Sequence, residues 1–415
     1  MRVLIVSQYF WPESFRINEV VESLRQAGCT VAVLTGQPNY PDGKIYSGYS
    51  PWASGRHDHV DGYPIYRVAI VPRGSGKAWR LALNYLSFAV SASIQGRWLL
   101  RGQHFDVILV YGMSPIFQAI PGIFLKRPMR AALVTWVQDL WPESIAVAGF
   151  VRNRWVLSCV GTVVKWIYRS CDLLLVQSRA FVPIVESMAE AVPVRYHPNP
   201  GELPSGETSE GTESGVTLEA GFNVVFAGNL GTVQALDTVL DAAERLAEYR
   251  DIHIVLVGSG SRRDWLVQEA AARKLSNVRF VARLPPQAMP SVFAQASALL
   301  VSLVRSPAMS NTIPSKVQAY LAAGRPIIAS LDGEGARVIS EAGAGLTCAA
   351  EDAAALAHAI LRMRGMSGPE LLQMGDAGRW YYRQHFDPVT LAQRLVEHFR
   401  DLHRGDRSQD SLGLG

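Results

Sequence analysis

Residues 222–231 read Phe-Asn-Val-Val-Phe-Ala-Gly-Asn-Leu-Gly, a short apolar run that ends in a glycine-rich loop. The run is rich in β-branched and aromatic side chains, as in a strand buried on both faces, and a helical pattern follows it at 236–246. Strand, loop and helix in this order are the repeating unit of a parallel sheet covered by helices. The same unit recurs along most of the chain.

Short apolar runs alternate with longer periodic segments on both sides of this unit, which predicts two α/β domains. Strands are expected at 3–7, 30–35, 65–70, 106–111, 132–137, 172–177 and 194–197, and then at 222–227, 252–257, 278–281, 298–303 and 326–329. Helices lie between them, and further helices are expected at 17–26, 351–364, 368–385 and 388–403. A proline-containing stretch with little apolar content separates the two sets of strands and predicts a linker.

The fold class is therefore α/β, with two doubly wound, Rossmann-like domains facing each other across a cleft. The predicted parts are a first domain at 1–200, a linker at 201–221, a second domain at 222–385, a closing helix at 386–405 and a disordered tail at 406–415. Doubly wound sheets bind ligands at the carboxyl ends of their strands, so functional side chains are expected in the loops there.

Composition restricts the class of protein. Of the 415 residues, 48% are hydrophobic and 18% charged, which is typical of a globular protein and excludes disorder, collagen and coiled coil. The four cysteines have no metal-ligand spacing, so reduced thiols in a cytosolic protein are expected. Residues 1–200 hold 20 Lys and Arg against 12 Asp and Glu, and residues 201–415 hold 20 against 24. The basic first half predicts contact with phosphates or a membrane face, whereas nucleic acid would need a denser cationic cluster.

Two apolar stretches of the first half are candidates for membrane contact. Residues 81–96 are uncharged and bracketed by Arg80 and Arg97, but they are too few and too polar to span a bilayer. Residues 154–169 combine apolar positions with basic residues and two tryptophans, which suits a helix lying in the interface plane. The alternative is that both are core helices. The apolar run after Met1 is too short for a secretory signal.

Dinucleotide and NTP-hydrolysing chemistry are disfavoured, because the loop after 3–7 has no glycine and no Walker A motif occurs. The second half has two glycine-rich loops, 228–231 and 257–260, each at the expected end of a strand. Backbone N–H groups of such loops stabilise an anion at a helix N-terminus, so they predict a diphosphate site, with plain tight turns as the alternative.

A lysine is unexpected at the start of another predicted helix. Residues 311–326 read Asn-Thr-Ile-Pro-Ser-Lys-Val-Gln-Ala-Tyr-Leu-Ala-Ala-Gly-Arg-Pro, and predict a helix from near Pro314 to Gly324. Lys316 then lies in the first turn, where a cation opposes the helix dipole. It is expected to meet an anion, either a diphosphate or a carboxylate. No metal site is predicted, since His57-Asp58-His59 is most simply a solvated loop.

Several motifs occur in a specific order. They are Asn39-Tyr40-Pro41 with Gly43-Lys44, residues 137–144 (Val-Gln-Asp-Leu-Trp-Pro-Glu-Ser), the loop 228–231, Pro314-Ser315-Lys316 with the helix after it, and Met374-Gly375 with Gly378-Arg379. Trp-Pro-Glu-Ser occurs twice, at 11–14 and 141–144. Together these motifs resemble glycosyltransferase family 4, and in particular the bacterial surface-polysaccharide enzymes of the colanic-acid and L-fucosamine-transferase type.

The resemblance covers residues 1–403 and implies a GT-B fold. It implies a retaining transfer from a nucleotide-diphosphate sugar, without a metal or other cofactor. The donor is implied to bind mainly to the second domain and the acceptor to the first. The helices near 368–385 are implied to cross back and brace the first domain.

The chain departs from the family pattern where members usually carry charge. The Arg and Lys that many members place after the first strand of the second domain correspond to Asn229 and Gln234. Of the two glutamates that often lie eight positions apart, the second corresponds to Ala319, after Gln318, and the first has no acidic match near Asn311. The departing diphosphate still requires positive charge. The available substitutes are Lys316, Arg262, Arg263 and Arg305, of which Lys316 is favoured.

In the first domain Asp139 is the favoured catalytic carboxylate, either accepting a hydrogen bond from the acceptor hydroxyl or stabilising charge at the reacting carbon. Glu143 and Glu13 are nearby alternatives, and a helix-capping role is the other interpretation of Glu143. By the resemblance, Arg16 is expected to hold an acceptor phosphate. The full candidate set is, for catalysis, Asp139, Lys316 and Glu143; for the donor, Gly228, Asn229, Leu230, Gly231, Gln234, Gly258, Gly260, Arg262, Arg283, Asn311, Ser315, Lys316 and Gln318; for the acceptor, Glu13, Arg16 and Asn39.

Three functional hypotheses follow. The first is a cytoplasmic glycosyltransferase, peripheral on the inner membrane face, that moves a hexosyl or N-acetylhexosaminyl group from a UDP-linked donor to a lipid-diphosphate-linked or saccharide acceptor in O-antigen or exopolysaccharide synthesis. GDP is the alternative base. The second is a catalytically inactive nucleotide-sugar-binding scaffold subunit, motivated by the missing charges. The third is a nucleotide-sugar epimerase on the same fold, which needs carboxylates near the sugar ring.

Overall fold

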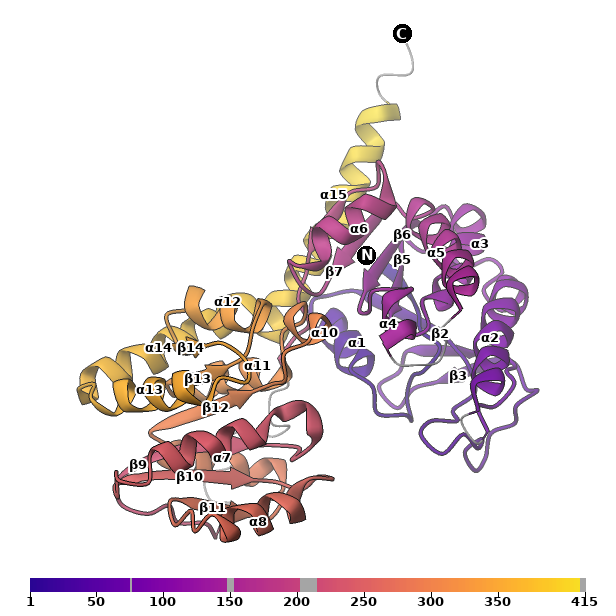
Figure 1. The fold of residues 1–415 in the computed structure, drawn as a ribbon. Coiled ribbons are helices and arrows are strands. Elements are labelled where there is room, and N and C mark those ends of the chain that lie inside the picture. Colours follow the sequence, from indigo (N-terminus) through magenta and orange to yellow (C-terminus); the bar gives the residue numbers. More distant parts are fainter. Residues whose placement is uncertain (75–76, 148–152, 202–214, 411–415) are drawn as a thin grey trace. The chain divides into compact units, whose positions relative to one another are not determined.

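The computed structural model describes residues 1–74, 77–147, 153–201 and 215–410. The chain divides into two compact units (Figure 1): Met1–Asn199 with Pro388–Gly415 form unit 1, and Pro200–Asp387 form unit 2. The predicted linker at 201–221 lies mostly outside the described residues, which resume at residue 215.

Unit 1 is built on an eight-stranded sheet with the order β3-β4-β2-β1-β5-β6-β7-β8. Neighbouring strands are parallel except β3 and β4, which form an antiparallel hairpin. The strands are β1 (Arg2–Val6), β2 (Thr30–Thr35), β3 (Gly55–Asp58), β4 (Pro64–Arg67), β5 (Val107–Gly112), β6 (Ala132–Val137), β7 (Leu173–Val176) and β8 (Val194–Tyr196). The sequence does not predict β3, because Gly-Arg-His-Asp carries no apolar signal and the strand forms by pairing with β4.

Helices cover both faces of this sheet. On one face, apolar side chains of four helices share a core with Leu34 of β2; they are α2 (Ala78–Leu99), α3 (Ile120–Met129), α5 (Arg154–Arg169) and α6 (Phe181–Ala189). On the other face, α1 (Ile17–Gln26) and α15 (Pro388–Asp410) share a core with Val33, whose side chain alternates with that of Leu34 across the strand. The short elements η1 (Ile116–Ala119) and α4 (Glu143–Val147) follow β5 and β6.

The bounds of α1 follow from its sequence. Ile17, Val20, Val21 and Leu24 recur at the spacing of one helix face and are all buried. The helix ends before Gly28, whose φ of +84° is the left-handed conformation that favours glycine after a helix. The helices predicted at 17–26 and 154–169 are present with those bounds.

Unit 2 is built on six parallel strands with the order β11-β10-β9-β12-β13-β14. The strands are β9 (Phe222–Ala227), β10 (Ile252–Val257), β11 (Val278–Val281), β12 (Ala298–Ser302), β13 (Ile327–Ser330) and β14 (Gly345–Cys348), of which the sequence does not predict β14. The helices are η2 (Thr232–Gln234), α7 (Leu236–Arg245), α8 (Arg263–Ala272), η3 (Pro286–Ala288), α9 (Met289–Gln295), α10 (Pro307–Ser310), α11 (Ser315–Ala323), α12 (Glu334–Glu341), α13 (Ala353–Arg364) and α14 (Gly368–His385). Separate apolar cores lie on the two faces of the sheet. The predicted class, two doubly wound α/β domains, is confirmed.

The last two helices belong to different units. α14, which the resemblance implied would brace the first domain, remains in unit 2, where Gly378 packs against Leu321 of α11. The helix that returns to unit 1 is α15, whose Leu395 and Phe399 are buried in the same core as α1. α15 extends to Asp410, beyond residue 405 where the sequence predicted its end. Residues 411–415 of the predicted tail lie outside the described residues.

Each sheet has one place where the strand order reverses. In unit 1, β1 lies between β2 and β5, and in unit 2, β9 lies between β10 and β12. Connections from the two neighbouring strands leave toward opposite faces at such a point, which opens a crevice at their carboxyl ends. The loops after β1, β5, β9 and β12 are therefore the positions to inspect for function.

Candidate functional site

The two glycine-rich loops of unit 2, which follow β9 and β10, are joined by backbone hydrogen bonds. Leu230 donates its N–H to the carbonyl of Ser259 at 2.9 Å, and Arg262 donates to the carbonyl of Leu230 at 2.9 Å. Gly258 has a φ of +149°, and a Cβ there would collide with the carbonyl oxygen of Gly228. Gly258 and Gly260 thus allow two backbones to approach closely. Some N–H groups expected to face an anion hold the loops together instead.

Lys316 lies beside the end of β9. Its Nζ donates a hydrogen bond to Oε1 of Gln234 and lies 4.2 Å from the ring centroid of Phe226. A Cβ on Gly228 would come within 2.6 Å of the lysine Cε, so the glycine makes room for this side chain. Gln234 ends η2, which comes before α7 in place of a direct loop-to-helix junction. The structure therefore brings together Gly228, Gln234 and Lys316 of the candidate set.

Among the described residues, the surroundings of Lys316 supply no counter-charge. No carboxylate among the described residues forms an ion pair with it, and burial lowers its pKa to about 8. An ammonium has three N–H donors, and Gln234 takes one of them. Lys316 lies in the first turn of α11, where the helix dipole also favours an anion. An anionic ligand would therefore stabilise this cation.

The other candidate cations of unit 2 are differently placed. Arg305 forms a 3.4 Å ion pair with Asp332, and Arg263 lies 3.8 Å from Asp264. Arg262 is stacked on Trp265, with 4.1 Å from its guanidinium carbon to the ring centroid, and is in no ion pair among the described residues. The remaining donor candidates divide by burial: Leu230, Gly231 and Gln318 are buried, Asn311 is half-buried, and Asn229, Arg283 and Ser315 are exposed.

In unit 1, Asp139 joins the loops after β5 and β6. Its Oδ2 accepts hydrogen bonds from the N–H and the hydroxyl of Ser114 at 3.1 and 2.8 Å. The Ser114 hydroxyl in turn accepts from the indole N–H of Trp141 at 3.0 Å. Oδ1 of Asp139 has no hydrogen-bond partner among the described residues and remains available to a ligand. Glu143 is exposed in the first turn of α4, where a carboxylate is favourable to the helix dipole.

Glu13 and Asn39, both candidates for the acceptor, are buried and hold loops in place. The Glu13 carboxylate accepts from the N–H groups of Asn39 and Tyr40 at 2.8 and 2.7 Å, and burial raises its pKa. The Asn39 side chain accepts from the N–H of Arg73 at 3.1 Å. Both residues therefore shape the loops after β1, β2 and β4 from beneath. Arg16 is half-buried at the N-cap of α1.

The sequence analysis missed a cluster of two tyrosines and one arginine in the loops at the carboxyl ends of the unit 1 strands. The Arg73 guanidinium carbon lies 5.6 and 5.1 Å from the ring centroids of Tyr9 and Tyr40, and Arg73 donates to the Tyr9 hydroxyl at 3.3 Å. Arg73 has no ion-pair partner among the described residues. Tyr9 follows the first strand, and Tyr40 belongs to a motif quoted for the resemblance, which was the available signal.

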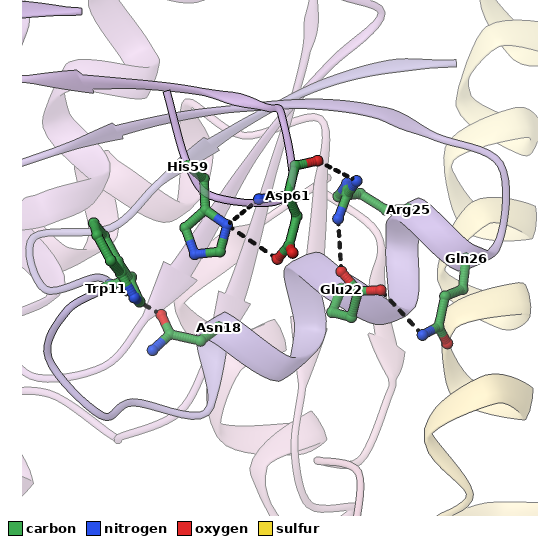
Figure 2. A network of polar contacts seen from close by, with 7 residues as sticks. All are labelled: Trp11, Asn18, Glu22, Arg25, Gln26, His59 and Asp61. Atoms are coloured by element: carbon green, nitrogen blue, oxygen red, sulfur yellow. Dashed lines mark hydrogen bonds and ion pairs between the residues drawn. The ribbon is translucent and has the colours of Figure 1, made fainter. Parts of the chain in front are cut away.

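His59, from the group considered for a metal, is part of the scaffold. Figure 2 shows it beside Asp61, with 3.0 Å between His59 Nδ1 and the carboxylate, in the turn between β3 and β4. Arg25 of α1 donates to the carbonyl of Asp61 at 2.8 Å, which ties this turn to the helix (Figure 2). Within the described ranges no group of three or more His, Cys, Asp or Glu is placed to hold a metal ion.

Two family models match the chain, one in each unit. Residues 14–200 match the glycosyl transferase 4-like domain, and residues 221–365 match the glycosyl transferases group 1. The chain is 25% identical over 340 residues to the colanic acid biosynthesis glycosyl transferase WcaI of Escherichia coli, covering 78% of this chain and 82% of that protein. It is 24% identical over 337 residues to the glycosyltransferase WbjE of Pseudomonas aeruginosa, covering 78% and 80%.

Solved structures share the whole architecture at low identity. Anabaena HepE in complex with UDP has a TM-score of 0.66 at 15% identity, covering 97% of this chain and 100% of that one. The E. coli trehalose-6-phosphate structure bound with UDP-2-fluoro glucose has a TM-score of 0.66 at 14% identity, covering 96% and 99%. These likenesses establish the GT-B fold. With both family models in order along it, the chain belongs to glycosyltransferase family 4 and is a glycosyltransferase of the GT-B type.

Proposed function

We propose that unit 2 binds a nucleotide-diphosphate sugar and that Lys316 holds its diphosphate. The observation that carries this is the lysine itself: a half-buried cation without a carboxylate partner among the described residues, at the point where the strand order reverses. Ligands of doubly wound sheets bind at that point. Leaving a buried cation without a counter-ion is unfavourable unless a ligand supplies one.

The position of Gln234 supports this role. Many family members carry a lysine there, and in this chain Gln234 instead accepts a hydrogen bond from Lys316. The positive charge therefore comes from α11 rather than from the loop after β9, but it reaches the same place. In this proposal α11 supplies the charge that is absent at positions 229 and 234.

The proposed reaction transfers a sugar with retention of configuration. The bond between the sugar C1 and the diphosphate oxygen breaks, a bond from C1 to the acceptor oxygen forms, and the hydroxyl proton leaves with the diphosphate or to solvent. Lys316 stabilises the negative charge that develops on the leaving oxygen. Asp139, oriented by Ser114 through one oxygen, uses the other to accept the hydrogen bond of the acceptor hydroxyl. The proposed chemistry uses no metal and no other cofactor.

UDP is the proposed nucleotide, and the acceptor is proposed to be a lipid-diphosphate-linked saccharide of a surface polysaccharide. The names of two structural neighbours include UDP or a UDP-sugar, and one relative is named for colanic acid biosynthesis. The basic first half of the chain suits an anionic acceptor. A hexosyl or N-acetylhexosaminyl group is proposed for transfer, by resemblance to the same subgroup.

A peripheral site of action at the inner membrane face is part of the proposal. α2, α3 and α5 carry half of the large apolar side chains that are exposed in the described residues, ten of twenty. Trp155 of α5 is 83% exposed and Trp98 of α2 is 72% exposed. Large exposed apolar patches with basic residues suit a lipid surface. No described helix is long and apolar enough to cross a bilayer.

The alternative is a nucleotide-sugar-binding scaffold without turnover. It is favoured by one observation: α11 carries Ala319, after the buried Gln318, where members often carry a glutamate. The two functions differ in turnover but not in nucleotide binding. An assay of sugar release from UDP-N-acetylglucosamine and UDP-glucose therefore separates them.

The first test is calorimetric titration of the protein with UDP, GDP and NAD, repeated with Lys316→Ala. Loss of a charge-assisted contact of about 2–3 kcal/mol predicts UDP binding that is about 30- to 150-fold weaker in the variant. Equal affinity in both proteins would remove Lys316 from the site. Asp139→Asn should lower turnover while UDP affinity is unchanged, and loss of UDP binding in that variant would contradict its assignment to the acceptor.

A further inference from the structure

The motif Asn39-Tyr40-Pro41 with Gly43-Lys44 is not explained by the donor site. Its last residues line a pocket of about 680 Å³ in unit 1, which lies within the usual size for a small-ligand site. Three segments form the walls: the loop after β2, the loop after β4 and the first turn of α2. The pocket thus lies at the carboxyl ends of β2 and β4. Asp139 follows the carboxyl end of the parallel strand β6, on the same side of the sheet.

The backbone beneath this pocket is tightly built. Gly74 donates its N–H to the carbonyl of Gly43 at 2.9 Å, and Gly43 donates to the carbonyl of Asn39 at 2.8 Å. Both glycines have positive φ, and a Cβ on Gly43 would collide with the Gly74 carbonyl. The buried Glu13 and Asn39 fix the same loops from below. The pocket is therefore held open by specific contacts.

The lining of the pocket is largely apolar, from Ile45, Val71, Pro72 and Trp79, and carries two cationic side chains. Lys44 and Arg80 both line it, and neither has an ion-pair partner among the described residues. Asp42 is the single carboxylate in the lining. Arg73, held against two tyrosine rings, lies between the lining residues Pro72 and Gly74 along the chain. This arrangement attracts a phosphate-bearing ligand more strongly than a neutral one.

An apolar stripe begins at the same pocket. Trp79 lines the pocket and is also the first of six exposed apolar residues on α2, followed by Leu83, Leu86, Val90, Ile94 and Trp98. Their spacing of three and four residues places them on one face of the helix, over a length of about 28 Å at 1.5 Å per residue. A ligand that fills both features has an anionic head and a long apolar tail.

We propose that the pocket walled by Lys44, Trp79 and Arg80 binds the diphosphate of the lipid acceptor, whose hydrocarbon begins at Trp79 and follows the exposed face of α2. The inference rests on the proposed transfer to a lipid-linked acceptor and assigns that acceptor a binding site. The two cations of the pocket, its apolar walls and its continuity with the apolar stripe through Trp79 favour a lipid diphosphate over a free sugar phosphate.

Farnesyl diphosphate is a suitable probe, titrated calorimetrically into the full chain. Lys44→Ala/Arg80→Ala should bind it about 10- to 100-fold more weakly, because two charge-assisted contacts are lost. Arg97→Ala/Arg101→Ala removes the same charge from the other end of α2 and should bind as the unchanged protein does. Lys44→Arg/Arg80→Lys should retain most of the affinity. Equal weakening in the control pair would show only a general charge effect and would overturn the site.

Comparison ligands identify what the pocket accepts. Inorganic diphosphate and farnesol should each bind more weakly than farnesyl diphosphate, and Trp79→Ala should reduce the difference between farnesyl and inorganic diphosphate. Inorganic diphosphate binding as tightly as the lipid would make this a free-phosphate site and overturn the proposal. Displacement of the probe by phosphatidylglycerol vesicles, with the same dependence on Lys44 and Arg80, would make it a bulk headgroup site and overturn it as well.

The test separates failure of this inference from failure of the proposed function. UDP affinity should be unchanged in Lys44→Ala/Arg80→Ala, because both residues lie in unit 1 and Lys316 lies in unit 2. A protein that binds the lipid probe but not UDP would refute the donor proposal and leave the pocket standing. A protein that binds UDP through Lys316 but shows no Lys44- and Arg80-dependent lipid binding would refute the pocket alone.

Discussion

Lys316 shows how the contacts of a single side chain determine its role. A lysine in the first turn of a helix needs an anion, and the open question was whether the protein or a ligand supplies it. The structure gives it a ring face and an amide oxygen, from Phe226 and Gln234, but no carboxylate among the described residues. These partners tolerate the ammonium while leaving N–H groups for a ligand. These contacts support the anion-binding role proposed for Lys316.

The lowered pKa of Lys316 predicts a pH dependence of donor binding. Burial lowers this pKa to about 8, so the free protein holds the ammonium below that pH and progressively loses it above. The proposed contact with UDP requires the ammonium, so affinity should fall about twofold between pH 7 and 8 and then by up to about tenfold per pH unit. Lys316→Arg keeps its charge over this range and should show a flat profile, measured by calorimetry at pH 7, 8 and 9. A falling profile in the arginine variant would assign the titration to another group.

Gly228 provides a second test at the scale of one residue. Its φ is +137°, and a Cβ would meet the Lys316 side chain at 2.6 Å. Gly228→Ala should therefore displace the lysine and weaken UDP binding about as much as Lys316→Ala does, and combining the two should add little. Gly343→Ala is the control, because Gly343 also has a positive φ but open space around it. It should lower stability by about 1 kcal/mol and leave UDP affinity unchanged.

Sequence alone identified Lys316 and Gln234 as candidates but not their contact. The unfavourable position of a lysine in the first turn of a helix can be recognised from sequence, because it depends only on residues within one helical turn. The hydrogen bond between residues 82 positions apart depends on how α11 packs beside β9. The same limit explains Glu13 and Asn39. Their polar side chains suggested contact with a ligand, whereas folding buries both and uses them to hold loops.

At the scale of elements, the exposed face of α2 carries a prediction for membrane binding. Leu86 and Val90 are 50% and 57% exposed, so their replacement should leave folding unchanged. Burying each in lipid contributes about 1.5–3 kcal/mol, so Leu86→Glu/Val90→Glu should reduce partitioning into phosphatidylglycerol vesicles by at least tenfold in a flotation assay. Leu372→Glu, on an exposed position of α14 in unit 2, is the control and should partition as the unchanged protein does. If the α2 variant partitions into vesicles as the unchanged protein does, α2 only packs against the sheet and does not bind lipid.

α15 brings a second histidine against the one at the end of β8, and the pair predicts loss of stability in acid. Burial lowers the pKa of His197 to about 3, and burial with the charge of Arg195 lowers that of His398 to about 4. Both imidazoles are neutral in the folded protein at pH 6, whereas in the unfolded chain they take up protons as the pH falls below about 6.5. The free energy of unfolding therefore decreases as the pH is lowered below that value. The slope for fully buried His197 is about 1.4 kcal/mol per pH unit. Urea unfolding at pH 7, 6 and 5 should show this loss, and His398→Gln should reduce the slope.

The elements that sequence predicted well are those whose pattern is local. α1, α5 and α14 have the predicted bounds, because apolar periodicity and their flanking residues define them. β3 was missed because its residues are exposed and polar, and it exists only through the hairpin with β4. β14 contains one glycine and a threonine in four residues and gave too short a signal. The unit to which the last helix belongs depends on contacts far from it in sequence.

At the scale of the molecule, the chain crosses between units twice, and this assigns α15 to the first unit. Unit 2 is complete from Pro200 to Asp387, with its own cores on both faces of its sheet. Unit 1 is not complete without the end of the chain, because Leu395, Val396 and Phe399 of α15 fill one of its cores together with α1. The stability of unit 1 therefore depends on residues that follow all of unit 2 in the sequence.

Ending the chain at Asp387 should destabilise unit 1 and spare unit 2. The truncation exposes the face of α1 and removes Leu395, Val396 and Phe399 from the shared core. Each contributes about 1.5–3 kcal/mol, which together is a large part of a typical domain's stability. Hydrogen exchange should become faster in β1 and α1, while amides of β9 and β12 keep their protection and UDP affinity stays within twofold. Phe399→Ala is the milder variant. It should lower the free energy of opening that hydrogen exchange reports for β1 and α1 by about 3–5 kcal/mol. Loss of UDP binding with unchanged protection of β1 would indicate that α15 supports unit 2 instead.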